Sequence, residues 1–350
     1  MTLAATTELV EISDPAASRA WRTYHESGMP ELIGAHHLCH ALDAFARTGM
    51  AARLAGGRAV TEEEAIGDLD PHLAGNLLRY LGIRGVVRAD DEGVALTSRG
   101  EALLSEVSVA QLGFYLEAYG PVTQHIPDML GGRMTYGVDV ERNGEALGRH
   151  CATLFRTFHT AVVLKALEGS DARHMLDLGC GGGQLLVDAC IRDPGLRGVG
   201  LDISPGAIEF ARELAEREGV ADRVSFVVGD AFAPETWPAE CHEADSLCAV
   251  GVVHEHFRAG EQAVLDILET YAGLLRGGMK TFILGEPEIR FDDEENDADL
   301  YLVHIFTAQG FPREHRRWLE LLERSSVRCR RLLYRPDAGP RFGFYDLVPR

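Results

Sequence analysis

The sequence lacks the features that mark several broad classes of protein. No apolar run approaches the roughly 20 residues that a helix needs to cross a bilayer. The N-terminus, MTLAATTELVEISDP, has neither the basic start nor the apolar core of a signal peptide. The seven cysteines include no C-x-x-C pair, which favours reduced, mostly buried thiols over disulfides or a thiolate metal site. We therefore expect a cytoplasmic protein with no membrane partner.

Positive charge is also scarce. The chain has 34 Lys and Arg against 54 Asp and Glu, which gives a formal net charge of -20. Such a chain repels phosphate backbones, so nucleic acid is not an expected partner. What remains is an ordinary globular composition of 350 residues, with 46% hydrophobic and 25% charged residues. This length is sufficient for two domains with their own cores.

Residues 1–168 are predicted to form a mainly helical domain. Apolar residues recur at helical spacing over 36–55, and Thr61 is placed to cap a helix that starts with acidic residues. A further helix is expected from His72 to near Gly82 or Gly85, and two short strands around an Asp-Glu-Gly turn follow it. This order is typical of a winged helix. Because the helices lack a basic stripe, the pattern favours a structural or dimerisation role over DNA binding.

Residues 169–350 are predicted to form a second domain of the α/β class. From Arg173 onward, short apolar runs alternate with amphipathic helices, which indicates a parallel sheet covered on both faces. The last two strands, RCRRLLYRP and RFGFYDLV, are separated only by a short Asp-Ala-Gly-Pro loop. The expected fold is a doubly wound sheet that ends in an antiparallel hairpin.

A glycine loop, LDLGCGGGQLL, follows the first strand of this sheet and opens its first helix. Gly179, Gly181 and Gly183 allow a tight turn and a close approach of the backbone to a ligand. The spacing fits a G-x-G-x-x-G dinucleotide motif poorly, because Gln184 stands where its third glycine should be.

Acidic residues lie at the ends of three successive strands. Asp177 precedes the glycine loop, and Asp202 ends the second strand, where an acid can accept hydrogen bonds from ribose hydroxyls. Asp230 ends the third strand and suits an adenine amine. A single acid of this kind is most often a cap or turn residue, but three of them beside a glycine loop predict one binding crevice at the carboxyl edge of the sheet.

This set resembles the class I S-adenosylmethionine-dependent methyltransferases over residues 170–350. The helical first part is similar to the dimerisation domain of small-molecule O-methyltransferases, which implies a homodimer. The resemblance implies a Rossmann-like fold in which Asp177 and the three glycines line the methionine and ribose side of the cofactor. It also implies that Asp202 holds the ribose and that Asp230 with Ala231 holds the adenine.

The stretch AVGVVHEHFRAGE places His254 at the end of the fourth strand. A histidine there can be structural, can act as the general base of an O-methyltransferase, or can bind a metal. His304 lies in the apolar helical stretch LYLVHIF, which we expect to cover the same sheet edge. Two imidazoles with open coordination positions suit iron or zinc. His256 is a lesser alternative ligand, because residues i and i+2 share a face on an extended strand.

The chain also resembles a narrower family, the metal-dependent 2-oxoacid C-methyltransferases of nonribosomal-peptide pathways. The resemblance rests on His254-Glu255, on LYLVHIFTAQGFPREHRRW and on GGRMTYGVDVERNGEALGRH. It implies that His254 and His304 bind a divalent iron or zinc ion, and that Arg133 holds a carboxylate or orders the site. Glu255 stands where the family usually has Asp, so its part in catalysis, as base, ligand or support, is open.

The function predicted from this resemblance is methylation of C3 of a hydrophobic 2-oxoacid, such as 4-methyl-2-oxopentanoate or an aromatic one. The metal-chelated enolate would be the nucleophile, and the product would serve β-methyl amino acid formation in peptide antibiotic biosynthesis. The main alternative is a small-molecule O-methyltransferase with His254 as general base, and a regulator that senses S-adenosylmethionine is a further one. Five side chains of the helical domain are candidates to line the substrate: Phe114, Tyr115, Tyr119, Met129 and Met134.

Overall fold

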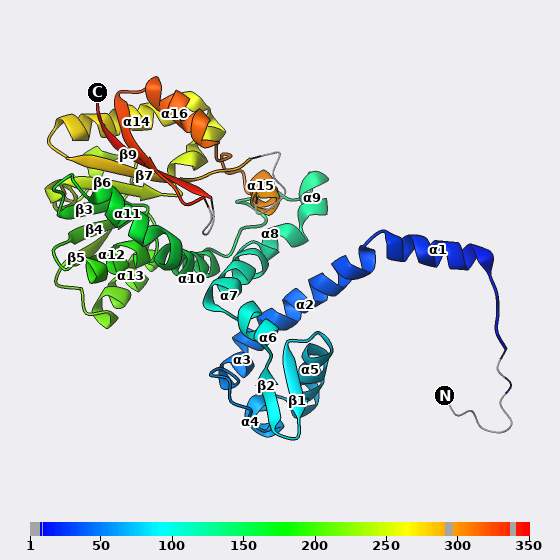
Figure 1. Cartoon of the computed structure of the whole chain (residues 1–350). Coiled ribbons are helices and arrows are strands. Elements are labelled where there is room, and N and C mark those ends of the chain that lie inside the picture. Colours follow the sequence, from blue (N-terminus) through cyan, green and yellow to red (C-terminus); the bar gives the residue numbers. More distant parts are fainter. Residues whose placement is uncertain (1–7, 9, 291–296, 337–340) are drawn as a thin grey trace. The chain divides into compact units, whose positions relative to one another are not determined.

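The computed structural model describes residues 8, 10–290, 297–336 and 341–350 (Figure 1). The chain divides into two compact units, Met1–Val109 and Ala110–Arg350. The sequence places the domain boundary later, at 168/169. The difference arises because the helices between these points pack on the second unit, where α8 (Gly120–Gln124) contacts α15 (Asp297–Phe306) and α11 (Thr160–Leu167) contacts the sheet.

The first unit has the helices and the two-stranded ribbon that the sequence predicts. Thr61 caps its fourth helix in a capping box: Thr61 Oγ1 accepts from Glu64 N at 3.1 Å, and Glu64 Oε2 accepts from Thr61 N at 2.9 Å. Phe45, Leu54 and Leu81 are fully buried in its core. Its elements are α1 (Pro15–Glu26), α2 (Met29–Arg47), α3 (Met50–Arg53), α4 (Glu62–Ile66), α5 (Pro71–Ile83), β1 (Val87–Asp90), β2 (Gly93–Leu96) and α6 (Ser98–Leu103), and α7 (Glu106–Gly113) crosses into the second unit.

The second unit contains a seven-stranded sheet in the order β5-β4-β3-β6-β7-β9-β8. The first five strands in this order are parallel, and β9 runs antiparallel to both β7 and β8. The predicted doubly wound sheet with a terminal hairpin is confirmed, while the predicted hairpin loop at 337–340 lies outside the described residues. The strands are β3 (His174–Leu178), β4 (Arg197–Asp202), β5 (Val224–Val228), β6 (Ser246–Val250), β7 (Thr281–Pro287), β8 (Val327–Leu333) and β9 (Phe342–Pro349).

Helices cover both faces of this sheet (Figure 1). One core contains α14 (Glu261–Arg276) and α16 (His315–Glu323), and the other contains α11, α12 (Gln184–Arg192) and α13 (Pro205–Arg217). The remaining helices are α9 (Ile126–Leu130), α10 (Gly144–Leu154), the π-helical turns η1 (Phe114–Ala118) and η2 (Phe155–His159), and the 3₁₀ helices η3 (Pro234–Thr236), η4 (Ala239–Glu243) and η5 (Val253–Ala259). Apolar strands buried on both faces explain the continuous hydrophobic runs in the sequence.

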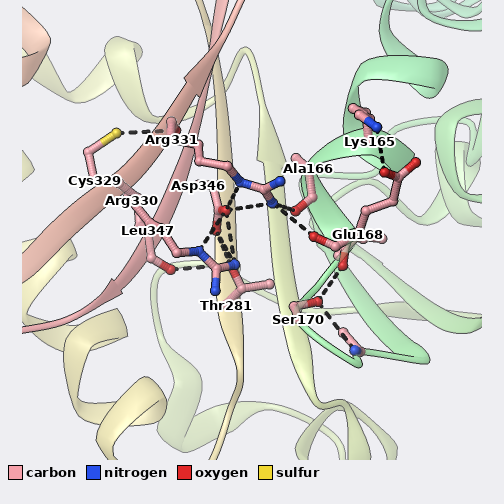
Figure 2. A network of polar contacts seen from close by, with 12 residues as sticks. Lys165, Ala166, Glu168, Ser170, Thr281, Cys329, Arg330, Arg331, Asp346 and Leu347 are labelled. Atoms are coloured by element: carbon pink, nitrogen blue, oxygen red, sulfur yellow. Dashed lines mark hydrogen bonds and ion pairs between the residues drawn. The ribbon is translucent and has the colours of Figure 1, made fainter.

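A buried carboxylate fastens the terminal hairpin to the rest of the unit (Figure 2). Asp346 on β9 is fully buried and accepts hydrogen bonds from Thr281 Oγ1 at 2.6 Å and from Arg331 Nε at 2.8 Å. Arg330 adds two more, at 3.0 and 3.1 Å. Arg331 also donates to the carbonyl of Ala166 at the end of α11. One side chain therefore connects β7, β8 and β9, and through Arg331 it connects them to a covering helix.

Two expectations from the composition can be compared with the structure. All seven cysteines are free; three are buried and four are partly buried, where the sequence predicts mostly buried thiols. Burial raises the pKa of Cys190 and of Cys241 to about 11, so both remain protonated at neutral pH. In the part of the chain that the structure describes, no helix combines the length and the apolar character needed to cross a membrane.

Candidate active site

The glycine loop turns sharply between β3 and α12. Gly179, Gly181 and Gly183 all have left-handed backbones, with φ of 69°, 51° and 74°, which L-residues with a Cβ adopt only at a cost. Gly179 N donates to the carbonyl of Leu201 at 2.8 Å, which joins the loop to β4. A Cβ on Gly183 would lie 2.6 Å from the ring of Phe226. Close packing and backbone conformation therefore both require glycine here.

Two of the predicted acids lie directly beside this loop. Asp202 at the end of β4 accepts from Gly181 N and from Ser204 N, each at 2.9 Å, so it orders the loop. Asp177 on β3 is only 2% exposed. Burial and the neighbouring charge of Asp202 raise the pKa of Asp177 to about 7. The structure thus brings both carboxylates together at the glycine turn.

The third predicted acid, Asp230, follows β5 at the same edge of the sheet. Its side chain is exposed, and its Oδ1 accepts from Phe232 N at 2.9 Å. The backbone of this turn is fixed by two buried aromatic residues: Trp237 Nε1 donates to the carbonyl of Asp230 at 2.7 Å, and the Tyr271 hydroxyl donates to that of Ala231 at 3.0 Å. The turn is therefore rigid while the carboxylate remains accessible.

His254 does not end a strand, which corrects the sequence prediction. Strand β6 stops at Val250, Gly251 takes a left-handed backbone with φ of 71°, and the chain continues as the 3₁₀ helix η5, which carries His254. The helix is held to the sheet because Val253 N donates to Glu286 Oε1 at 2.8 Å. The imidazole is 4% exposed and still lies directly beyond the fourth parallel strand.

Glu286, which the sequence reasoning missed, holds this imidazole. It lies near the end of β7, is 1% exposed, and its Oε2 is 2.6 Å from His254 Nδ1. A carboxylate only accepts hydrogen bonds, so His254 Nδ1 carries the hydrogen and Nε2 is left for other partners. The signal was present in FILGEP: an acid at the end of a parallel strand, the same pattern that selected Asp202 and Asp230.

His304 on α15 meets His254 across the site. Its Nδ1 lies 2.7 Å from the carbonyl of Leu300, and its Nε2 lies 3.4 Å from His254 Nε2. Burial and the neighbouring His254 lower the pKa of His304 to about 4, so its ring is neutral at physiological pH. The structure thus brings together two histidines that are 50 residues apart in the chain.

The two histidines fit part of a metal site. Two nitrogens that each lie about 2.1 Å from a tetrahedral ion stand roughly 3.4 Å apart, and this is the separation of the two Nε2 atoms. Among the described residues, no group of three His, Cys, Asp or Glu side chains is placed to hold a metal ion. His254 and His304 could therefore hold only an ion that takes its other ligands from water or substrate.

His256 has a different environment from that predicted. On a 3₁₀ helix, with three residues per turn, positions i and i+2 do not share a face as they do on a strand. The ring of His256 packs on Phe232, with centroids 4.1 Å apart, and burial lowers its pKa. The reason for considering it as a substitute for His254 therefore no longer applies.

Glu255 joins a polar network beside the histidines. Its Oε1 accepts from Gln309 Nε2 at 2.6 Å and lies 3.7 Å from Arg142 Nη2. Arg142 also donates to the hydroxyl of Tyr119 at 3.3 Å. Burial raises the pKa of Tyr119 to about 12, so the phenol stays protonated. Glu255 is thus supported by an amide and a guanidinium that the sequence reasoning did not select.

Arg133 makes its contacts elsewhere. Its side chain is 63% exposed and pairs with Asp128, with Nε at 2.8 Å and Nη2 at 2.7 Å from Oδ1. This pairing lowers the pKa of Asp128. The cation that the structure places beside Glu255 is Arg142, nine residues later in the same segment, and periodicity alone does not distinguish the two arginines.

The aromatic candidates for substrate contact pack on the helix that carries His304. Tyr119 and Val303 belong to one buried cluster, and Phe114 and Tyr115 pack against it. Met129 on α9 and Met134 after it are partly buried. The structure thus places the three aromatic residues next to α15.

Comparison with known proteins agrees with this geometry. Residues 170–268 match the family model described as "Methyltransferase domain". The ribosomal protein L11 methyltransferase of Photobacterium profundum is 31% identical over 136 residues, which is 38% of this chain and 41% of that protein. The chain therefore spans less than half the length of this relative.

Two solved structures extend the likeness to nearly the whole chain. The mitomycin 7-O-methyltransferase has a TM-score of 0.66 at 23% identity, covering 95% of this chain and 100% of its own. Human N-acetylserotonin methyltransferase in complex with S-adenosylmethionine has a TM-score of 0.67 at 17% identity, covering 97% and 99%. The chain thus has this fold, with a helical first part, and its residues 170–268 match a methyltransferase domain.

Proposed function

We propose that this protein methylates a small molecule with S-adenosylmethionine, and that the acceptor atom is an oxygen deprotonated by His254. The observation that carries the proposal is the buried hydrogen bond of 2.6 Å between Glu286 Oε2 and His254 Nδ1. It fixes the tautomer and leaves Nε2 as the nitrogen that can take a proton. The names of two proteins with this fold, a mitomycin 7-O-methyltransferase and an N-acetylserotonin methyltransferase, support small-molecule methylation.

The cofactor would be held at the carboxyl edge of the sheet. The glycine loop offers a close backbone approach, and Asp202 and Asp230 lie at successive strand ends beside it. When bound, S-adenosylmethionine supplies an electrophilic methyl group on a positively charged sulfur. When ionised, the buried Asp177 adds negative charge on this side of the sheet, which favours a cationic ligand.

In the proposed reaction, His254 Nε2 takes the proton of an acceptor hydroxyl as its oxygen attacks the methyl carbon. The carbon–sulfur bond breaks, and the electron pair stays on sulfur, which becomes the neutral thioether of S-adenosylhomocysteine. Glu286 stabilises the imidazolium that forms, because its carboxylate is already bonded to Nδ1. Burial of both side chains keeps water from competing for this hydrogen bond.

One observation favours a second candidate, the metal-assisted C-methylation of a 2-oxoacid. Both Nδ1 atoms are held by acceptors, so two Nε2 lone pairs face each other at 3.4 Å, an arrangement that a shared ion would stabilise. Such an ion would acidify C3 by chelating the keto acid. Arg142, whose side chain is 26% exposed, could meet a carboxylate nearby. O-methylation needs only the base, so it leaves the position of His304 without a chemical role.

The two candidates separate with three variants and a chelator. A panel of phenols and of 2-oxoacids is assayed with S-adenosylmethionine, with and without EDTA. Base-catalysed O-methylation predicts that His254→Ala and Glu286→Gln lose about 10²-fold or more in kcat. It also predicts that His304→Leu and the chelator leave activity nearly unchanged.

Metal-assisted C-methylation predicts instead that His304→Leu and the chelator both abolish transfer to a 2-oxoacid. Full activity of His254→Ala on every acceptor would overturn both candidates. Binding of S-adenosylhomocysteine by each variant serves as the control for an intact cofactor site.

A further inference from the structure

Three histidines occur within five residues on α2, at His36, His37 and His40. No part of the proposed methyl transfer uses them, and they lie in the first unit of the chain. His36 and His40 are one helical turn apart, and their ring centroids lie 4.7 Å from each other with planes at 76°. Residues four apart lie on the same face of a helix, so these two rings point in the same direction.

In a single copy of the chain, these two imidazoles are available to a ligand. Both side chains are exposed, and within the described residues no hydrogen bond or ion pair engages either ring. His37 is also exposed, but its ring lies farther from that of His36, with centroids 5.6 Å apart. His36 and His40 therefore form the closer pair, and His37 serves as the control position.

We propose that His36 and His40 bind a divalent transition-metal ion as a two-point clamp on the surface of α2. Paired histidines at i and i+4 on a helix can direct one nitrogen each to the same ion, as in helical zinc motifs. Imidazole suits zinc, copper and nickel, whereas calcium and magnesium prefer oxygen ligands. The remaining coordination positions would be open to water or to a donor from another molecule.

The neighbouring thiol does not complete the site in the free protein. Cys39 lies between the two histidines in sequence, but it is partly buried whereas both imidazoles are exposed. The clamp consequently has two protein ligands. Binding should stabilise α2, because an ion that binds only the folded helix shifts the folding equilibrium towards it.

In the test, chelator-treated protein is titrated with Zn²⁺, and binding is measured by calorimetry. Because His254 and His304 could also take an ion, all variants carry His254→Ala and His304→Leu as a common background. In that background we expect the protein to bind one Zn²⁺ that His36→Ala/His40→Ala loses, with affinity falling by more than about tenfold. His37→Ala should retain the site.

Far-UV circular dichroism verifies that each variant keeps its helices, since all three positions are exposed. Equal zinc binding by the His36→Ala/His40→Ala protein and its parent would overturn the proposal. The proposal would also fail if the parent protein bound no zinc, or if His37→Ala lost as much zinc affinity as the double variant. Either result would show that the paired rings of His36 and His40 do not hold the ion.

Discussion

At the scale of single residues, the chemistry of the candidate active site depends on two nitrogen atoms. The Nδ1 atoms of His254 and His304 each lie within hydrogen-bonding distance of an acceptor. Their Nε2 atoms face one another at 3.4 Å. Because the pKa of His304 is lowered to about 4, its ring is neutral at neutral pH. Glu286 is hydrogen-bonded to Nδ1 of His254 and so leaves Nε2 as the nitrogen that can take a proton from an acceptor.

A prediction at this scale concerns Asp177 and the pH dependence of cofactor binding. Burial and Asp202 raise its pKa to about 7, and a cationic ligand should prefer the ionised carboxylate. Affinity for S-adenosylmethionine should therefore rise about tenfold from pH 6 to pH 8, measured by calorimetry. The Asp177→Asn protein should lose this rise, whereas Asp222→Asn, a change at an exposed acid after α13, should keep it.

The same shift has a consequence for the unliganded protein. Because the folded-state pKa of Asp177 lies above its unfolded value, the folded protein holds the proton more tightly. The protonated Asp177 therefore contributes to the stability of the fold. This contribution is present below the unfolded pKa, near 4, and is lost as the pH rises through about 7. A cofactor affinity that stays flat across this range in the wild type would show that Asp177 does not face the ligand's charge.

At the scale of elements, the sequence was most informative where local chemistry determines structure. The capping box at Thr61, the start of α12 at Gln184 and the alternation of strands and helices all follow from short-range rules. Strand-end acids could be selected because parallel strands end at one edge. Glu286 obeyed the same rule but was not selected, although it closes the apolar run MKTFILGE.

Other features depended on packing that no local pattern records. A left-handed Gly251 ends β6 early and converts the expected strand end into η5. Which arginine of the 133–142 segment approaches Glu255 depends on where the chain turns after α9, and Arg133 instead finds Asp128 five residues away. The nearness of His254 and His304 required the whole sheet and α15, since neither helix nor strand spacing connects them.

A prediction at this scale tests the carboxylate that fastens the hairpin. Asp346→Asn removes the charge that Arg330 and Arg331 share, and leaves two guanidinium groups close to each other in a part-buried place (Figure 2). We expect a loss of about 3–5 kcal/mol in the free energy of unfolding, measured by urea denaturation. Arg328→Ala, at an exposed position of the same strand, should change it by less than about 0.5 kcal/mol. A loss below about 1 kcal/mol for Asp346→Asn would contradict the role assigned to this network.

At the scale of the whole molecule, the first unit exposes more apolar surface than a solitary chain would be expected to leave in water. No residue of α1 is buried, and Trp21 on this helix is 63% exposed. The next helix exposes Leu32 to the same extent, with Met29 and Ile33 beside it. Helices as short as α1 are marginal alone in water, so a covering partner would stabilise it. We propose that this partner is a second copy of the chain.

The last prediction follows from this proposal. Because two copies would bury the apolar side chains of α1 and α2 together, charging that surface should separate them. Light scattering coupled to size exclusion should give the mass of two chains for the wild type and of one chain for Trp21→Asp/Leu32→Asp. Val138→Asp, at a residue 80% exposed in the second unit, should remain dimeric. A monomeric wild type at micromolar concentration would rule out the second copy as the cover. If instead the double variant keeps the mass of two chains, the copies must meet through another surface.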